Sequence, residues 1–184
     1  MKPIRNNQQT TNAGIITARR NRVLERQGYI GLLLRILFLV LAGWLLFSQV
    51  FLITQISGND MFPAVKDGDL AIAFRLQQEY VKNDVVLYTV NGETHIGRVI
   101  ARETDVVTLD DSGTLLVNGT AQSGEILYPT YPKEGLEYPY KVPEGQVFIF
   151  GDYRTQTEDS RDFGSIPLEN VQGKVITILR RRGL

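Results

Sequence analysis

Residues 84–101 read DVVLYTVNGETHIGRVIA, and this stretch decides the expected class of fold. It contains two runs rich in β-branched and aromatic residues, DVVLYTV at 84–90 and THIGRVIA at 94–101. Asn91 and Gly92 stand between them, a dipeptide that favours two-residue hairpin turns because both turn positions take positive φ. The stretch therefore predicts a pair of antiparallel strands.

Similar short runs recur after about residue 57. They are LAIAFRL (70–76), DVVTLD (105–110), TLLVNG (114–119), QVFIFGD (146–152) and KVITILR (174–180). Turn formers separate them, so residues 57–184 are expected to form an all-β domain, a barrel or sandwich of short antiparallel strands. The segment 120–145 has four prolines and four tyrosines and is predicted to be a long surface loop or flap.

The composition excludes several functions. The chain has no cysteine, so it has neither a disulfide framework nor a thiolate metal site. Its net charge is zero, but residues 1–56 carry +6 and residues 57–184 carry −6. An acidic domain is a poor nucleic-acid partner, and no spaced set of metal ligands such as HExxH appears. We expect no cofactor and no metal.

Residues 30–56 read IGLLLRILFLVLAGWLLFSQVFLITQI and form an almost wholly apolar run. This length suffices to cross a bilayer as a helix, and a soluble core helix is seldom apolar on every face. The run is too long for a cleavable signal peptide and no small-x-small site follows it. Residues 30–56 are therefore predicted to be a single-pass signal anchor in the cell membrane.

The charge before the span predicts its orientation. The basic flank should keep the N-terminus in the cytoplasm and place residues 57–184 outside. Residues 1–29 are basic, polar and rich in Asn, Gln and Thr. We expect this tail to be largely disordered, with a short helix from Thr17 into the span.

Four segments behind the anchor carry a recognisable pattern. They read DMFPAV at 60–65 followed by Gly68-Asp69, NDVVLY at 83–88, GRVIA at 97–101, and GDYR at 151–154 followed by TEDSRDFGSIP at 157–167. In this order they resemble the conserved boxes of the type I signal peptidases (peptidase family S26), membrane-anchored serine peptidases that remove signal peptides from exported proteins. The resemblance covers about residues 30–184 and implies that family's β domain behind one transmembrane helix.

The resemblance also locates the catalytic positions. In that family a serine of the first segment attacks the scissile carbonyl, and a neutral lysine of the third takes its proton. Here Asp60 stands at the serine position and Gly97 at the lysine position. Glycine supplies no base, and a carboxylate ~4 Å from the oxyanion would repel it by about 1 kcal/mol in water and about 4 kcal/mol at an effective dielectric of 20. The dyad is degenerate.

Two other side chains are candidate replacements. Ser57 lies three positions before Asp60 in the same loop and should miss the cleft. His95 lies on the same face of its strand as Gly97, and signal peptidases of some lineages use a histidine base. Because His95 has no nucleophile to serve, we interpret it as a half-exposed strand residue.

An aspartic pair of Asp60 with Asp152 or Asp159 was also weighed. The resemblance places Asp152 near Arg98 and Asp159 with Arg161, where both carboxylates should stay ionised. A pair that shares one proton is therefore not expected.

The remaining site residues are implied by the resemblance alone. The framework of the cleft would consist of Arg98, Asp152, Arg154, Asp159, Ser160 and Arg161. Met61, Phe62 and Pro63 would form a hydrophobic edge toward a bound peptide or the membrane, with core packing as the equal alternative.

The chain resembles the dyad-less signal peptidase homologues of Gram-positive pilus loci. This resemblance implies a non-catalytic assembly factor or chaperone that binds an exported protein such as a pilin, or a sortase, during pilus polymerisation. The alternative is an active type I signal peptidase with unusual chemistry; a purely structural subunit of a peptidase complex is a weaker one. The sequence does not determine the oligomeric state.

Overall fold

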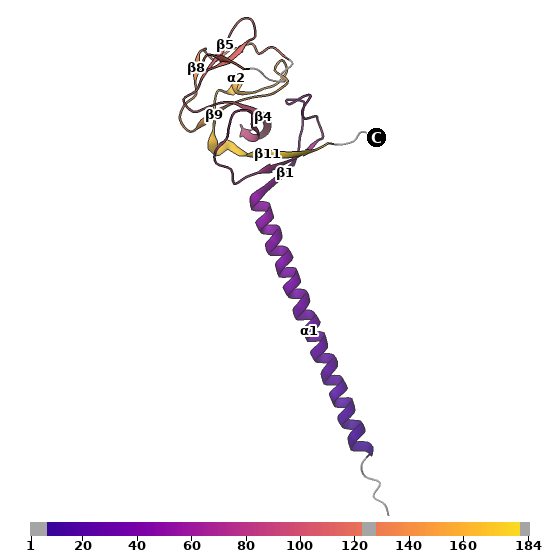
Figure 1. Cartoon of the computed structure of the whole chain (residues 1–184). Coiled ribbons are helices and arrows are strands. Elements are labelled where there is room, and N and C mark those ends of the chain that lie inside the picture. The colour runs from indigo at the N-terminus through magenta and orange to yellow at the C-terminus, as the bar shows by residue number, and fades with distance from the viewer. Residues whose placement is uncertain (1–6, 123–127, 181–184) are drawn as a thin grey trace, which may run out of the picture. The chain divides into compact units, whose positions relative to one another are not determined.

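The computed structural model describes residues 7–122 and 128–180, with side chains from residue 28 onward (Figure 1). The chain divides into two compact units, residues 1–47 and 48–184, which are described separately. The described part of the first, residues 7–47, lies in one long helix, α1 (Asn7–Val50). Within it, the 23 residues Gly28–Val50 have a mean hydropathy of 2.5 and none is buried, so this helix is long and apolar enough to cross a membrane.

The helix differs from the predicted anchor at both ends. It begins at Asn7, so residues 7–29 are helical where a largely disordered tail was expected; residues 1–6 lie outside the described part. No proline lies between residues 7 and 29, and residues 18–27 are mostly Ala, Arg, Leu, Glu and Gln, which favour a helix. The helix also includes residues 7–17, although the Asn, Thr and Gly residues there are weak helix formers. The helix ends at Val50, and the last residues of the predicted anchor form strand β1 (Phe51–Gln55). β-branched and aromatic residues favour this strand, which pairs with β2 (Leu70–Phe74).

The second unit is built from two antiparallel sheets, which confirms the expected fold class. The larger sheet contains, in spatial order, β1, β2, β11 (Val171–Leu179), β3 (Val85–Val90), β4 (Glu93–Arg102), β9 (Gln146–Phe150) and β10 (Ile166–Pro167). The smaller contains β7 (Thr120–Ala121), β6 (Leu115–Val117), β5 (Val106–Leu109) and β8 (Tyr140–Lys141). Two short helices, α2 (Ser160–Phe163) and η1 (Leu168–Asn170), precede β11.

All seven runs predicted as strands are strands in the structure. β3 and β4 pair up to Val90 opposite Glu93, and the turn residues Asn91 and Gly92 have φ of 52° and 86°. The predicted loop at 120–145 contains β7 and β8, and β8 pairs with β5. The smaller sheet therefore uses both ends of that segment, a pairing that local sequence does not reveal.

Three clusters of buried apolar residues hold the sheets together. One lies between β4, β9 and the smaller sheet and includes Ile100, Val107 and Phe148, all fully buried. A second includes Tyr88 and Ile149. The third packs β2, β3 and β4 against the loop after β1. This loop carries Asp60, so the third cluster fixes the first of the two degenerate positions.

Candidate functional site

Asp60 is held by its backbone. It lies in the loop between β1 and β2, where the Asp60 carbonyl oxygen accepts a hydrogen bond of 2.9 Å from the Tyr153 amide. Gly151 passes so close that a Cβ built on it would lie 2.7 Å from the same oxygen. The loop therefore docks on the segment after β9 whatever the side chain at residue 60.

The Asp60 carboxylate is half-buried. Burial raises the pKa of Asp60 above its ordinary value of 3.8; nearby Asp159 and Glu158 raise it further, whereas His95 lowers it. Such a carboxylate carries no nucleophilic hydroxyl and does not replace the expected serine.

Gly97 lies in β4 opposite Val86, and the space beside it is filled. A Cβ built on Gly97 would lie 2.5 Å from Cγ2 of Ile149, 3.1 Å from the Phe150 carbonyl oxygen and 3.2 Å from Cε1 of Tyr88. Any side chain at this position therefore requires Ile149 or β9 to move. This packing was not predictable from the glycine alone.

Two aromatic side chains, Tyr88 and His95, lie beside the site. The Tyr88 ring is 1% exposed, and burial raises the pKa of its phenol far above the ordinary value, so it stays protonated. The His95 ring stacks on the Tyr88 ring with a centroid distance of 5.5 Å. Its centroid also lies 5.5 Å from that of the Phe163 ring. His95 is a half-exposed strand residue packed between two rings, and Ser57 is an exposed loop residue before β2.

The two ion pairs expected from the resemblance are present. Arg98 binds Asp152 with both forks, Nε to Oδ1 at 2.8 Å and Nη2 to Oδ2 at 2.6 Å. Arg98 also donates to the Asn83 carbonyl at 3.0 Å. This bidentate pair joins β4 to the segment after β9.

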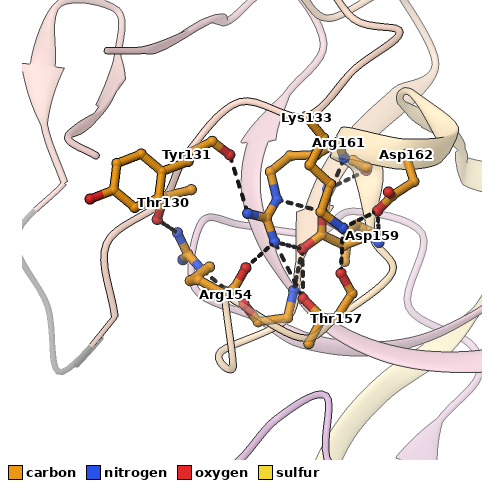
Figure 2. Close-up of polar contacts among 11 residues, drawn as sticks. Thr130, Tyr131, Lys133, Arg154, Thr157, Asp159, Arg161 and Asp162 are labelled. Atoms are coloured by element: carbon orange, nitrogen blue, oxygen red, sulfur yellow. Dashed lines mark hydrogen bonds and ion pairs between the residues drawn. The ribbon is translucent and has the colours of Figure 1, made fainter. Parts of the chain in front are cut away.

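Asp159 is the centre of the second network, which Figure 2 shows. Arg161 donates Nε to Oδ1 at 2.9 Å and Nη2 to Oδ2 at 2.8 Å, and both side chains are almost completely buried. Asp159 also caps α2 by accepting the Arg161 amide, and it accepts the hydroxyl of Thr157 and the amide of Gly151. All of these bonds occupy the carboxylate, so Asp159 is not available to share a proton with Asp60.

Arg154 is the least exposed large polar side chain of the site, at 1%. It donates Nε to the Gly151 carbonyl at 2.8 Å and Nη1 to Oγ1 of Thr130 at 2.5 Å, and it lies over the Phe150 ring at 4.9 Å. Burial lowers the pKa of Arg154 to about 10. Ser160 has a simpler role, since its Oγ accepts the Ile149 amide at 2.9 Å.

Basic side chains hold residues 130–133 against the segment 151–167. The sequence did not reveal this role. Arg154 binds Thr130, Arg161 donates to the Tyr131 carbonyl at 3.3 Å, and Lys133 donates to the Thr157 carbonyl at 2.6 Å (Figure 2). Lys133 also pairs with Asp162 at 2.5 Å. Residues 130–133 of the predicted flap are therefore held in place by hydrogen bonds of three basic side chains.

The hydrophobic edge is smaller than predicted. Met61 is 1% exposed and belongs to the third core cluster, so for this residue the core alternative is correct. Phe62 is half-buried and Pro63 is exposed. The Phe62 ring contacts Tyr153 at 5.9 Å, and Tyr153 contacts Tyr128 at 4.9 Å. These three rings form an aromatic row that sequence reasoning missed; Tyr153, where the signal peptidase motif has asparagine, was its one visible sign.

Within residues 7–122 and 128–180 no three His, Asp or Glu side chains gather as metal ligands would. Asp60 and Gly97 supply neither the serine hydroxyl nor the lysine amine that the resemblance implies for catalysis.

Comparisons with known proteins place the chain. The family model for signal peptidase, peptidase S26, matches residues 29–179. The probable thylakoidal processing peptidase 2 of Arabidopsis thaliana is 31% identical over 138 residues, covering 66% of this chain and 36% of the relative. Signal peptidase I of Bacillus caldolyticus is 28% identical over 136 residues, covering 65% of this chain and 74% of the relative.

A crystal structure of a signal peptidase I from Enterococcus faecalis V583 is 28% identical, with a TM-score of 0.46, and covers 54% of this chain and 97% of that one. The chain spans well under half the length of the thylakoidal relatives that it matches. On the family model's match over residues 29–179, the chain belongs to the signal peptidase family, peptidase S26.

Proposed function

We propose that this chain is a non-catalytic member of its family that binds polypeptide at the membrane surface without cutting it. The observation that carries the proposal is the packing around Gly97, where Ile149, Phe150 and Tyr88 fill the place of a lysine base. The acid at residue 60 adds a charge that opposes the oxyanion of acyl transfer. Both halves of the dyad are absent, and one of the two places is closed.

Retention of the surrounding scaffold supports a binding role. The buried Asp159–Arg161 pair and the bidentate Arg98–Asp152 pair hold the segments beside Asp60 and Gly97 in place. Exposed edges of a β-sheet can bind an extended chain by strand pairing. The Phe62–Tyr153–Tyr128 row offers aromatic surface beside them. Aromatic side chains supply most of the binding energy in many interfaces.

The proposed partner is an exported protein such as a pilin, or a sortase, and the proposed role is an assembly factor or chaperone in pilus polymerisation. The support is the resemblance to dyad-less homologues of Gram-positive pilus loci. Anchoring by Gly28–Val50, with the basic N-terminal flank in the cytoplasm, would place the β domain on the side where exported chains emerge.

The first test is a cleavage assay. Full-length protein in detergent micelles is incubated with a signal-peptide precursor and with a pilin precursor, beside an active signal peptidase I. We expect no product from this chain. Turnover that is lost in Asp60→Asn, which keeps the shape of the side chain, would establish the alternative of an active peptidase with unusual chemistry.

The second test compares variants in pilus-forming cells. Asp60→Ala should leave pilus polymerisation intact, because the residue's carboxylate does not hold the loop. Phe62→Ala should weaken partner binding, by roughly 30-fold if the ring is an anchor worth ~2 kcal/mol. Protein level and melting temperature are the controls. Lost assembly in a well-folded Asp60→Ala protein, with Phe62→Ala unaffected, would refute the binding account.

A further inference from the structure

Two hairpin turns of the β domain are built from the same pattern. Residues 90–93 read Val-Asn-Gly-Glu and join β3 to β4, and residues 117–120 read Val-Asn-Gly-Thr and join β6 to β7. In both turns the first and fourth residues are paired across the hairpin. The φ angles of the Asn and Gly also agree, 52° and 86° in the first turn and 51° and 76° in the second. The chain therefore contains two copies of one turn with matched backbones.

The side chain of the second asparagine, Asn118, is fixed by hydrogen bonds to the beginning of β5. Its Oδ1 accepts the Val106 amide at 2.8 Å, and its Nδ2 donates to Oδ1 of Asp105 at 2.7 Å. The Asn118 backbone amide also donates to the Val106 carbonyl oxygen at 2.8 Å. Both atoms of the side-chain amide are thus engaged, and the amide cannot turn unless these bonds break.

The side chain of the first asparagine, Asn91, is not held in this way. Asn91 and Asn118 are both exposed, so exposure does not distinguish them. In the part of the chain that the structure describes, no group is hydrogen-bonded to the side-chain amide of Asn91. A Cβ built on Gly92 would have no neighbour within 4 Å, so the space beside the turn is open. The Asn91 amide is free to rotate over the backbone nitrogen of Gly92.

An asparagine followed by glycine can lose its side-chain nitrogen without an enzyme. The glycine backbone nitrogen, after it loses its proton, bonds to Cγ of the asparagine, and the side-chain nitrogen takes up a proton and leaves as ammonia. Water then opens the resulting succinimide ring at one of its two C–N bonds, which gives aspartate or isoaspartate. Glycine has no Cβ to hinder the attack. The balance is one water consumed and one ammonia released, and the step requires a side-chain amide that can rotate.

We propose that Asn91 is a site of spontaneous deamidation in the folded protein, and that Asn118 is protected by its bonds to Asp105 and Val106. Asn91 should react about 30-fold faster than Asn118, the factor that corresponds to two hydrogen bonds of ~1 kcal/mol each. This modification lies outside the proposed function, since it needs neither a partner nor the degenerate positions.

The products change the hairpin that carries Gly97. An aspartate at residue 91 adds a negative charge beside the exposed Glu93, in a domain whose sequence already carries −6 from residue 57 onward. Isoaspartate adds one atom to the backbone of a two-residue turn, so the pairing of Val90 with Glu93 cannot stay as it is. Register in a hairpin depends on the length of its turn. Deamidation of Asn91 therefore loosens the end of β3 and the start of β4.

The test follows both asparagines in one sample. Full-length protein in detergent micelles is kept at mildly alkaline pH, and portions taken over time are digested with trypsin at slightly acidic pH, where the reaction is slow. Trypsin releases residues 83–98 and 103–133 as separate peptides, each with one of the two turns. Mass spectrometry measures deamidation of each peptide, and fragment spectra separate Asn91 from Asn83 and isoaspartate from aspartate. A second sample, unfolded in guanidinium chloride, is the reference.

In the folded protein we expect deamidation at Asn91 and about 30-fold slower deamidation at Asn118, whereas in guanidinium chloride the two rates should be equal. Asp105→Ala removes the acceptor of the Asn118 Nδ2 group and should speed deamidation of Asn118 about fivefold, the effect of one lost hydrogen bond, without a change at Asn91. Asp111→Ala, which removes an exposed acid between β5 and β6, is the matched control and should change neither rate.

Equal rates at the two asparagines in the folded protein would overturn the proposal. So would a difference of the same size in guanidinium chloride, because the flanking sequence rather than the fold would then set the rates. Deamidation of Asn91 that occurs only in the unfolded sample would show that the folded turn protects this residue, and would refute its assignment as the site. A folded Asp105→Ala protein with an unchanged rate at Asn118 would refute the protection by hydrogen bonds.

Discussion

A single methyl group at residue 97 should destabilise the β domain, although glycine to alanine is among the smallest changes a chain can carry. The added Cβ would lie 2.5 Å from Cγ2 of Ile149 and 3.1 Å from the carbonyl oxygen of Phe150. Ile149 is fully buried, and its side chain is branched at Cβ. Rotation about χ1, which would move the Cγ2 methyl group away, is therefore restricted. The clash must be relieved by a shift of β9 or a strained rotamer.

The magnitude follows from two opposing effects. Overpacking a filled core costs ~1–3 kcal/mol. Replacing glycine by alanine lowers the entropy of the unfolded chain, which by itself stabilises the folded state by ~0.4–1 kcal/mol. Gly97→Ala should therefore destabilise by about 1–2 kcal/mol, which lowers the melting temperature by roughly 4–8 °C in a domain of this size. Thr94→Ala, an exposed change on the same strand, is the control and should have little effect.

A double-mutant cycle isolates the contact. Ile149→Ala alone should cost ~2–5 kcal/mol because it leaves a cavity. In that background the methyl group of Gly97→Ala enters the vacated space, so it should be neutral or stabilising, with a coupling energy of ~1–3 kcal/mol. Thermal and urea unfolding in detergent micelles, followed by near-ultraviolet circular dichroism, gives all four stabilities. A wild-type melting temperature for Gly97→Ala, or a cost that does not depend on Ile149, would refute the claim that the base position is filled.

Three further outcomes are expected. Arg161→Ala should lower the free energy of unfolding by ~3–5 kcal/mol, because it leaves the Asp159 carboxylate buried without its cation. Urea unfolding should show a smaller loss of stability for Arg161→Lys. Equal stability of Arg161→Ala and wild type would contradict the role given to the pair. The pKa of Asp60 is raised in the folded state, so the folded protein binds this proton more tightly, and the stability it contributes is present below pH 3.8 and falls as pH rises through the raised pKa. Asp60→Asn should thus stabilise at neutral pH relative to wild type and lose this advantage in acid, and melting temperatures that differ by a constant amount across pH would count against the assignment. Protease added to intact protoplasts should digest the β domain and spare the N-terminal tail, and a protected β domain would reverse the proposed orientation.

The strands were predictable because their signal is local. Runs such as those at 84–90 and 94–101 carry β-branched residues on both sides of an Asn-Gly turn, and tertiary packing agrees with that preference. β1 was missed for the opposite reason. Residues 51–55 are apolar and directly follow the span, and an apolar run gives no periodicity that separates helix from strand. Its pairing with β2 joins residues that lie far apart in the sequence, so local sequence does not predict it.

The site divides in the same way. The partners of Arg98 and Arg161 followed from the resemblance to signal peptidases. The filling of the space beside Gly97 did not, since it depends on where Ile149 of another strand falls. The same applies to the bond from Arg154 to Thr130, which joins residues 24 positions apart. For Met61 the resemblance left a hydrophobic edge and core packing as equal alternatives, and only the fold places it in the third core cluster.

The way Asp60 is held has an evolutionary consequence. Its loop is fastened through the Asp60 carbonyl oxygen, which accepts a hydrogen bond from the Tyr153 amide, so this bond does not depend on the side chain at residue 60. A serine at residue 60 would keep the bond that fastens the loop. The position of Gly97 is different, because a lysine would meet Ile149 before it reached the cleft. Under the proposed function the two positions therefore differ: a return to serine–lysine chemistry would need a new side chain at residue 60, whereas at residue 97 it would also need a change at Ile149, a buried residue with no part in that chemistry.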